Sequence, residues 1–279
     1  GKRAVAADKP KLQLAGVQSS LRFADANGGD PRVATVLTDA ADRLYALKDI
    51  EQAQRVAERV LALDPPATAD QRRVATTVLA NTAFEGGAFD RAEKRYGELL
   101  TLTPANDKSR AELVERQAAS IYKQGEAAQK SGKAADAVGH FTRVAAVAPG
   151  SAIHASAQYD AAAAMSGLKD WDNVAKTLED FRQRFPKHPL VDDASSKLAV
   201  AYLEKGRWSE AAGEFERALG RLVGRRLGCR LAHQRQDGDV GLARCPVAPG
   251  LVAHDDLEQL VHGLGESVER EVRLRQLEA

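Results

Sequence analysis

The sequence predicts an all-α protein, an α-solenoid in which about five antiparallel helix pairs stack into a right-handed superhelix. Three observations favour this fold class. A helical motif recurs five times, proline follows four of the five copies at a fixed distance, and aromatic residues make up only 5% of a chain dominated by good helix formers. Because one helix pair cannot bury its own apolar face, such units are stable only when several of them stack.

The recurring motif describes one face of the second helix in each pair. An aromatic residue, isoleucine or alanine is followed three positions later by a small residue, and four positions after that by another apolar residue. Spacings of three and four place all three side chains on one helical face, where a small residue admits the close approach of a neighbouring helix. The five copies are Ile50/Ala53/Ala57, Phe89/Ala92/Tyr96, Ala134/Ala137/Phe141, Trp171/Val174/Leu178 and Trp208/Ala211/Phe215.

Proline ends four of these second helices. It lies twelve residues after the central small residue, at Pro65, Pro104, Pro149 and Pro186, and proline cannot continue a helix. The central residues are 39, 45, 37 and 37 positions apart. The predicted units cover residues 33–66, 72–105, 111–150, 152–189 and 190–219.

An amphipathic stretch precedes each motif and is expected to form the first helix of the pair. Short polar turns that contain glycine join several first helices to their partners, as at Gly86-Gly87, Gly132 and Gly206. Glycine permits the positive φ that a tight turn between helices needs. The predicted first helices are residues 33–46, 72–85, 111–130, 152–167 and 190–204.

The two ends depart from this pattern. Residues 1–30 are expected to hold a helix near 11–26, either a lead-in or capping helix or the remnant of a preceding repeat. Residues 220–279 form a divergent tail, with a possible helix at 254–278 and loop or disorder before it. From 221 onward there are nine arginines and no lysine, so this tail is either a separate module or the product of an altered reading frame.

Charge and hydropathy exclude two kinds of partner. Forty basic and thirty-nine acidic residues leave a net charge of +1, so no global field draws the chain to nucleic acid or to an anionic membrane. No stretch approaches the roughly 18 to 20 apolar residues of a membrane span. A start at Gly1 and not at methionine is compatible with a removed leader, a lipid-anchored terminus or further repeats upstream.

The residues that could carry chemistry are not arranged as a site. Cys229 and Cys245, with His233 and His254 nearby, lack the spacing of two to four residues typical of zinc ligands. The alternative to a zinc site is that the two cysteines form a disulfide or are free thiols. We therefore expect no metal, and the sequence offers no cofactor motif.

Clustered carboxylates are expected to cap helices. The pairs Asp192-Asp193 and Asp255-Asp256, together with segments 68–70 and 107–109, lie where helices should begin. Acidic and hydroxyl side chains at such positions satisfy free backbone N–H groups and the helix dipole. Because no phosphate loop or nucleophile motif occurs either, the chain is expected not to be an enzyme.

Two segments carry a family resemblance. Residues 87–92 and 206–212, the latter with Phe215, resemble the second helix of the tetratricopeptide repeat family. Gly125 matches the glycine of that family's first helix, whereas the other units carry alanine there, at Ala41, Ala80, Ala162 and Ala199. The resemblance covers about 31–219 and implies a scaffold that binds protein or peptide partners.

A narrower resemblance lies in residues 181–190, followed by Ala194, Leu198, Ala199 and Tyr202. This segment is similar to repeats of bacterial envelope proteins, including the outer-membrane assembly lipoprotein and the periplasmic partner of the Tol system. The resemblance implies a periplasmic or envelope-associated bacterial protein. A cytoplasmic location is the alternative.

In this architecture the first helices line a concave partner-binding surface. Aromatic side chains in such a groove are anchors for a peptide or a partner helix, or else they pack between adjacent repeats. Only Asn81 resembles the family's clamp for carboxyl-terminal peptides. The predicted partner-binding residues are Tyr45, Asn81, Phe84, Tyr122, Glu126, Tyr159 and Lys197, with Leu203 further along.

These observations predict a non-enzymatic scaffold or adaptor in a bacterial envelope complex, which binds extended or helical segments of other proteins. The alternatives are the accessory repeat region of a larger enzyme or secretion machine, and a cytoplasmic adaptor. The last repeat lacks the polar cap of a finished solenoid. Self-association through that end, continuation of the repeats, or cover by the tail is therefore expected.

Overall fold

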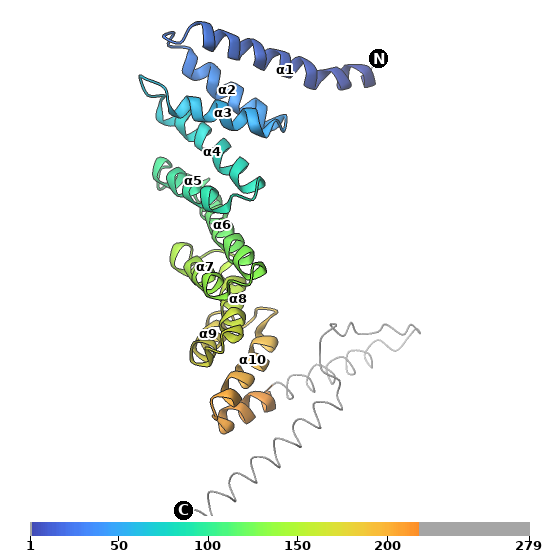
Figure 1. Ribbon diagram of the computed structural model, residues 1–279, viewed down its shortest axis with the longest axis vertical. Coiled ribbons are helices and arrows are strands. Elements are labelled where there is room, and N and C mark those ends of the chain that lie inside the picture. Colours follow the sequence, from blue (N-terminus) through green and yellow to red (C-terminus); the bar gives the residue numbers. More distant parts are fainter. Residues whose placement is uncertain (1, 218–279) are drawn as a thin grey trace, which may run out of the picture. The chain divides into compact units, whose positions relative to one another are not determined.

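The computed structural model describes the backbone of residues 2–217 and the side chains of residues 11–217. The described residues form helices joined by short turns, without strands (Figure 1). Residues 208–217 are helical as well. The ten complete helices are α1 (Lys2–Ala26), α2 (Val33–Ala46), α3 (Ile50–Leu61), α4 (Ala69–Glu85), α5 (Phe89–Leu102), α6 (Arg110–Lys130), α7 (Ala134–Val147), α8 (His154–Gly167), α9 (Trp171–Arg184) and α10 (Val191–Glu204).

The chain divides into two compact units, Gly1–Ala194 and Ser195–Ala279. Within the first unit each helix contacts the next one in the chain, and α2 also contacts α4, as α6 does α8. Helices that follow one another in sequence therefore follow one another in space (Figure 1). This arrangement confirms the predicted α-solenoid.

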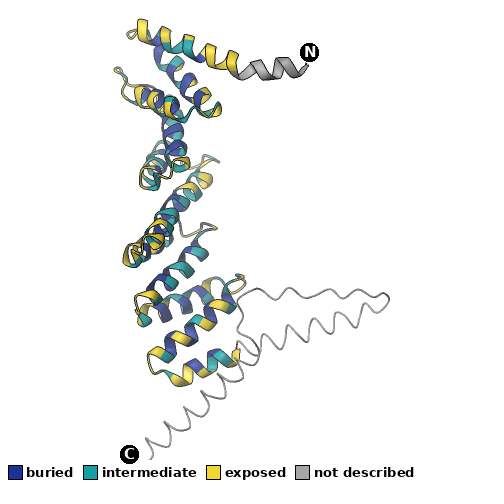
Figure 2. Ribbon diagram, turned by 45° about the vertical axis from the view of Figure 1, so that its right-hand side comes forward, coloured by how far each residue is buried: buried dark blue, intermediate teal, exposed yellow. Residues whose placement is uncertain are grey.

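The motif residues form the cores of the helix pairs. Ala53, Ala92, Ala137, Val174 and Ala211 are each at most 1% exposed, and buried residues line the side of each helix that faces its neighbours (Figure 2). The first motif positions are only half-buried or exposed; Trp208 is 42% exposed. The central position of the motif thus marks the packed face as predicted, whereas the first position lies at its edge.

Glycine is required at one crossing of two helices. A Cβ added to Gly125 on α6 would lie 2.6 Å from Cε1 of Phe141 on α7, which is closer than two carbon atoms can pack. The alanine that the other units carry at this position would therefore not fit in this pair unless Phe141 moved. The ring of Phe141 lies directly over the glycine.

The five turns inside the helix pairs share one backbone conformation. Gly87, Gly132 and Gly206 have φ values of 76°, 73° and 68°, as the sequence suggests, but Lys48 and Lys169 also have positive φ, at 62° and 58°. Each of the five residues lies five positions before the central small residue of its motif. The turn is thus set by the hairpin geometry and not by the presence of glycine.

Helix α1 is longer than predicted. It begins at Lys2 and continues through Pro10, where the sequence suggested a start near residue 11. Val17 and Ala24 are buried against α2, and the Gln18 amide donates to Gln52 Oε1 of α3 at 3.2 Å. Helix α1 therefore extends the packed core beyond the first predicted repeat.

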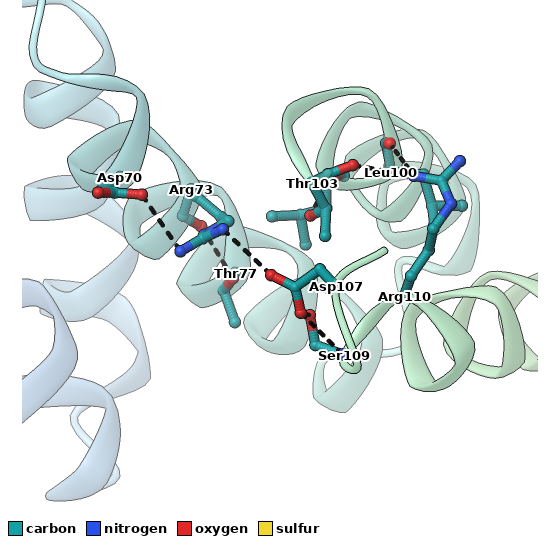
Figure 3. A network of polar contacts seen from close by, with 9 residues as sticks. Asp70, Arg73, Thr77, Leu100, Thr103, Asp107, Ser109 and Arg110 are labelled. Atoms are coloured by element: carbon teal, nitrogen blue, oxygen red, sulfur yellow. Dashed lines mark hydrogen bonds and ion pairs between the residues drawn. The ribbon is translucent and has the colours of Figure 1, made fainter. Parts of the chain in front are cut away.

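The loop between α5 and α6 is fixed by two arginines (Figure 3). Arg73 of α4 lies 3.2 Å from Asp70 and 3.6 Å from Asp107 of the loop. Asp107 accepts hydrogen bonds from the Ser109 backbone N–H and hydroxyl at 2.9 and 2.8 Å. Arg110 Nη1 donates to two carbonyl oxygens at the end of α5, those of Leu100 at 2.6 Å and Thr103 at 3.0 Å.

The carboxylates and hydroxyls of this region therefore have structural partners. The Ser109 backbone N–H is the main reason that the pKa of Asp107 lies below its usual value. Thr68 accepts from the Gln71 backbone N–H and forms a capping box at the start of α4, which confirms the predicted cap. Asp192 and Asp193 lie in the first turn of α10.

Candidate protein-interaction surface

The candidate surface is the side of α2, α4, α6 and α8 that carries the predicted partner-binding residues of the first compact unit, hereafter the first-helix face. Its members are half-buried, so each side chain is partly accessible and partly packed. Lys197 lies on α10 in the second compact unit. The members are Tyr45, Asn81, Phe84, Tyr122, Glu126 and Tyr159.

The tyrosines of this face make one recurring contact. The hydroxyl of Tyr45 donates to Glu85 Oε1 at 2.6 Å, and that of Tyr122 donates to Asp160 Oδ2 at 2.5 Å. Tyr159 donates in the same way to Asp193 Oδ2. Each bond joins one first helix to the next, so these hydroxyls already connect adjacent repeats.

The contact on α2 lies near solvent. Lys48 Nζ is 3.3 Å from both carboxylate oxygens of Glu85, and lies 5.1 Å from the centre of the Tyr45 ring. Burial, followed by the bond to Glu85, raises the pKa of Tyr45 to about 12. The bond from Tyr45 and then that from Lys48 lower the pKa of Glu85. At neutral pH the phenol is therefore neutral and the carboxylate charged.

The contact on α6 is less hydrated. The Tyr122 ring packs on Phe141 with ring centres 5.3 Å apart. Burial raises the pKa of Tyr122 and also that of Asp160, where it outweighs the opposing effect of the Tyr122 hydrogen bond. The negative charge of Glu126 raises the pKa of Asp160 further. Asp160 is thus a carboxylate held in an unfavourable environment by one hydrogen bond.

The remaining members bond within their own repeat. Asn81 Oδ1 accepts from the Tyr96 hydroxyl at 2.7 Å. Phe84 packs edge-to-face on Phe89 with centres 5.4 Å apart. Glu126 accepts from Lys123 Nζ at 2.6 Å. Among the described residues the amide nitrogen of Asn81 has no hydrogen-bond partner, so it is a free donor on this face.

Arg116 is a charged residue near this face that the sequence did not suggest. Its guanidinium on α6 acts electrostatically on Tyr45, Glu85 and Tyr96. It is 49% exposed and 3.6 Å from Glu112. Asn81 and Arg116 together therefore offer hydrogen-bond donors on two neighbouring first helices.

The carboxylate partners Glu85, Asp160 and Asp193 were also not predicted as part of this surface. They lie 40, 38 and 34 residues after their tyrosines, close to the repeat period. In an alignment of the repeats, Glu85 and Asp160 fall one position after the site of their tyrosine, and Asp193 falls three positions before it. The helical projection of a single unit shows only which residues share a face.

Other predicted features fall partly outside the described residues. Cys229, Cys245, His233 and His254 and the predicted helix 254–278 lie there. Within the described residues no group of three or more histidine, cysteine or acidic side chains is placed to hold a metal ion. In the same part of the chain, no helix combines the length and hydropathy needed to cross a membrane.

Two family models match the chain. The YfiO outer membrane lipoprotein family matches residues 114–209, and a tetratricopeptide repeat family matches residues 194–230. No curated protein shows significant similarity. The first match covers α6 to α10, including the Tyr122 and Tyr159 contacts.

Three solved structures are similar to the chain. The MamA protein is 18% identical with a TM-score of 0.39, over 76% of this chain and 100% of that chain. YrrB, described as a TPR protein with an unusual peptide-binding site, is 15% identical with a TM-score of 0.38, over 73% and 92%. BtubC from P. vanneervenii is 16% identical with a TM-score of 0.35, over 88% and 96%.

Proposed function

We propose that this tetratricopeptide repeat protein is a non-enzymatic scaffold that binds peptide or helical segments of partner proteins on the first-helix face. The repeat fold supplies a row of adjacent first helices, and the tyrosine–carboxylate contacts hold neighbouring helices in register. A surface held in this way is preorganised, so a partner does not have to order it on binding.

Asn81 and Arg116 carry the proposal. The side-chain amide nitrogen of Asn81 is a free donor, while its oxygen is fixed by Tyr96. A fixed amide donor is suited to a peptide carbonyl, and an exposed guanidinium to a carboxylate. The rings of Tyr45 and Phe84 supply apolar area on the same face. This combination matches an extended peptide segment better than a small substrate.

Site-specific photo-crosslinking tests this surface. A photoreactive phenylalanine analogue replaces Asn81 or Arg116 in the intact chain, and envelope extract is irradiated with each variant. The control replaces Lys94, an exposed residue of α5. We expect the same partner to crosslink at positions 81 and 116 and not at 94. A partner recovered only from position 94, or equally from all three, would contradict the proposal.

The substitutions Asn81→Ala and Arg116→Ala then measure the contribution of each donor. Each should weaken binding of the recovered partner by roughly tenfold. This is the effect of losing one charged or well-placed hydrogen bond of about 1.4 kcal/mol. Isothermal titration calorimetry with the purified partner gives the dissociation constants. Unchanged affinity in both variants would place the partner elsewhere.

We further propose an envelope location in a bacterial cell. The match of residues 114–209 to an outer membrane lipoprotein family supports it. Fractionation of cells that express the complete native gene with a carboxy-terminal tag provides the test. Recovery with the periplasm or the membranes is expected; recovery only with cytoplasmic proteins would favour the cytoplasmic adaptor.

A further inference from the structure

A groove lies between α7, α8 and α9, apart from the first-helix face. It has a volume of about 420 Å³, within the range of roughly 300 to 1,000 Å³ that ligand sites occupy. None of the residues of the first-helix face lines it. Lining residues include Phe141, Gln158, Ala161, Lys176, Asp180 and Arg184.

The two walls of this groove differ in character. On the α7 side the accessible apolar residue is the half-buried Ala145, because Phe141 and Ala161 of α8 are at most 1% exposed. The α9 wall is polar and charged, because Lys176, Asp180 and Arg184 are spaced by four residues and so share one helical face. No residue of α7 in the groove carries a charge.

The charged α9 residues that line the groove, Lys176, Asp180 and Arg184, leave an excess of one positive group. Arg184 Nε donates to Asp180 Oδ1 at 2.8 Å, and Gln158 Nε2 donates to Asp180 Oδ2 at 2.7 Å. Burial opposes ionisation of Asp180, but these hydrogen bonds together hold its pKa below the usual value. Lys176 is exposed and makes no ion pair among the described residues. Its ammonium is therefore available to an anion.

An unused acceptor lies in the floor. The amide of Gln158 is oriented by bonds from Nε2 to Asp180 and to the Thr177 carbonyl oxygen at 3.0 Å. Its Oε1 is the one buried side-chain oxygen or nitrogen atom without a hydrogen-bond partner in the described part of the chain. Such an orphaned group in a folded protein calls for an ordered water, because an atom with almost no accessible surface is out of reach of a ligand in the groove.

The dimensions favour a peptide. Lining residues of α9 run from Asn173 to Arg184, a distance of about 16 Å at 1.5 Å per helical residue. An extended chain of about five residues spans that length. Arg184 is paired with Asp180, so Lys176 is the one lysine or arginine of the lining without an ion pair in the described chain, which matches a single carboxylate better than a row of phosphates.

We propose that this groove binds an acidic peptide segment of a partner protein. A carboxylate side chain of the segment pairs with Lys176, and an apolar neighbour packs on Ala145. The groove would hold a second segment independently of the first-helix face.

The test uses synthetic, fluorescein-labelled hexapeptides in which aspartate and leucine occur in every arrangement of three each, with asparagine versions as uncharged controls. Fluorescence anisotropy with the full chain measures binding. We expect at least one aspartate peptide to bind with a dissociation constant below about 1 mM and its asparagine version to bind at least about tenfold more weakly. Added salt should weaken the interaction because the lysine is exposed.

Two groove variants and two controls locate the site. Lys176→Glu reverses the free charge and Thr142→Trp, at an exposed position of the α7 wall, fills the groove. Each should weaken binding at least about tenfold, a change of about 1.4 kcal/mol. Lys94→Glu makes the same charge change on an exposed position of α5, and Asn81→Ala alters the first-helix face. Both controls should leave binding within about twofold.

Several results would overturn the proposal. One is that no aspartate peptide binds with a dissociation constant below about 1 mM. Another is that the asparagine versions bind with equal affinity, and a third is that Lys176→Glu and Lys94→Glu lose the same amount of peptide affinity. Loss of binding in Asn81→Ala with normal binding in both groove variants would place the peptide on the first-helix face. That last outcome would support the proposed function while overturning this inference. Far-ultraviolet circular dichroism checks that each variant is folded.

Discussion

Tyr122 and Tyr45 make the same kind of hydrogen bond in different surroundings. The acceptor of Tyr122, Asp160, is half-buried and accepts no other hydrogen bond among the described residues, whereas Glu85 has a 41% exposed side chain and also binds Lys48. Tyr122→Phe should therefore lower the free energy of unfolding by about 1 to 3 kcal/mol, because it leaves a half-buried carboxylate without its hydrogen bond. Tyr45→Phe should lower it by less than about 1 kcal/mol. Urea unfolding of both variants measures the two changes, and equal losses would contradict this account.

As the pH falls, the carboxyls of Asp160 and Glu85 should change the stability of the fold in opposite directions. Asp160 has a raised pKa, so the folded state binds its proton more tightly, and the cost of ionising it disappears as pH falls through the folded pKa. Glu85 has a lowered pKa, so the stability it adds is present above its unfolded value of about 4.5 and is lost as pH falls. Asp160→Asn should thus gain stability relative to the native chain at pH 7 and lose that advantage toward pH 4. Glu85→Gln should be less stable at pH 7 and approach the native chain only as the pH falls below about 4.5.

Thermal unfolding of these variants between pH 4 and pH 8 provides the measurement. The informative quantity is the difference between each variant and the native chain at the same pH, since other groups titrate in both. If the two differences changed in the same direction with pH, the assigned surroundings of the two carboxyls would be wrong.

At the level of elements, the turn inside each helix pair allows a direct test. Lys169 holds a φ of 58° without glycine's freedom, and its side chain is exposed. A left-handed residue with a Cβ costs about 1 to 2 kcal/mol, partly offset by the extra entropy that glycine loses on folding. Lys169→Gly should therefore raise the free energy of unfolding by roughly 0.5 to 1 kcal/mol.

Gly132→Ala is the matched control, because it makes the reverse change at the same place in another repeat. Gly132 has a φ of 73°, and nothing lies within 4 Å of an added Cβ, so only the backbone conformation opposes alanine. This variant should be less stable by about 1 kcal/mol. Chemical denaturation should show the two changes with opposite signs; a loss of stability in Lys169→Gly would contradict the argument.

The sequence predicted where the helices end better than where they begin. The predicted first helices end at residues 46, 85, 130, 167 and 204, as α2, α4, α6, α8 and α10 do, because each ends at a short polar turn, several of which contain glycine. Predicted and observed helix starts differ by up to three residues. The largest difference is at α4, where the cap Thr68 and not the apolar pattern decides the start. The turns at Lys48 and Lys169 were missed, since their conformation follows from the packing of the pair and leaves no local signal.

The candidate surface could be predicted only in part, for a related reason. Helical periodicity finds Tyr122 and Asn81, because it depends on residues of one helix. It does not find Asp160 or Arg116, since their relation to those residues depends on how one repeat packs on the next. Likewise, the groove beside Lys176 arises from three helices, and no single segment of the sequence contains it.

In the whole first unit, the apolar core is divided into separate clusters. One includes Leu44 and extends from α1 to α4, while others belong to α4 and α5 or to α6 through α8. Close contacts run mainly between helices that are adjacent in the chain. Stability in such an array is approximately a sum of repeat and nearest-neighbour terms, so a defect in one repeat should not spread evenly through the others.

Hydrogen exchange of two core variants tests this division. Leu44 and Leu178 are both fully buried, on α2 and α9, and replacing either by alanine removes roughly 2 to 5 kcal/mol of packing. Leu44→Ala should lower amide protection in α1 to α4 and leave α8 and α9 close to the native chain; Leu178→Ala should do the reverse. Mass spectrometry of exchanged peptides resolves the two regions. An even loss of protection along the unit in both variants would show that it unfolds as one cooperative core, in which a partner bound to α4 and α6 would stabilise α9 as much as α5.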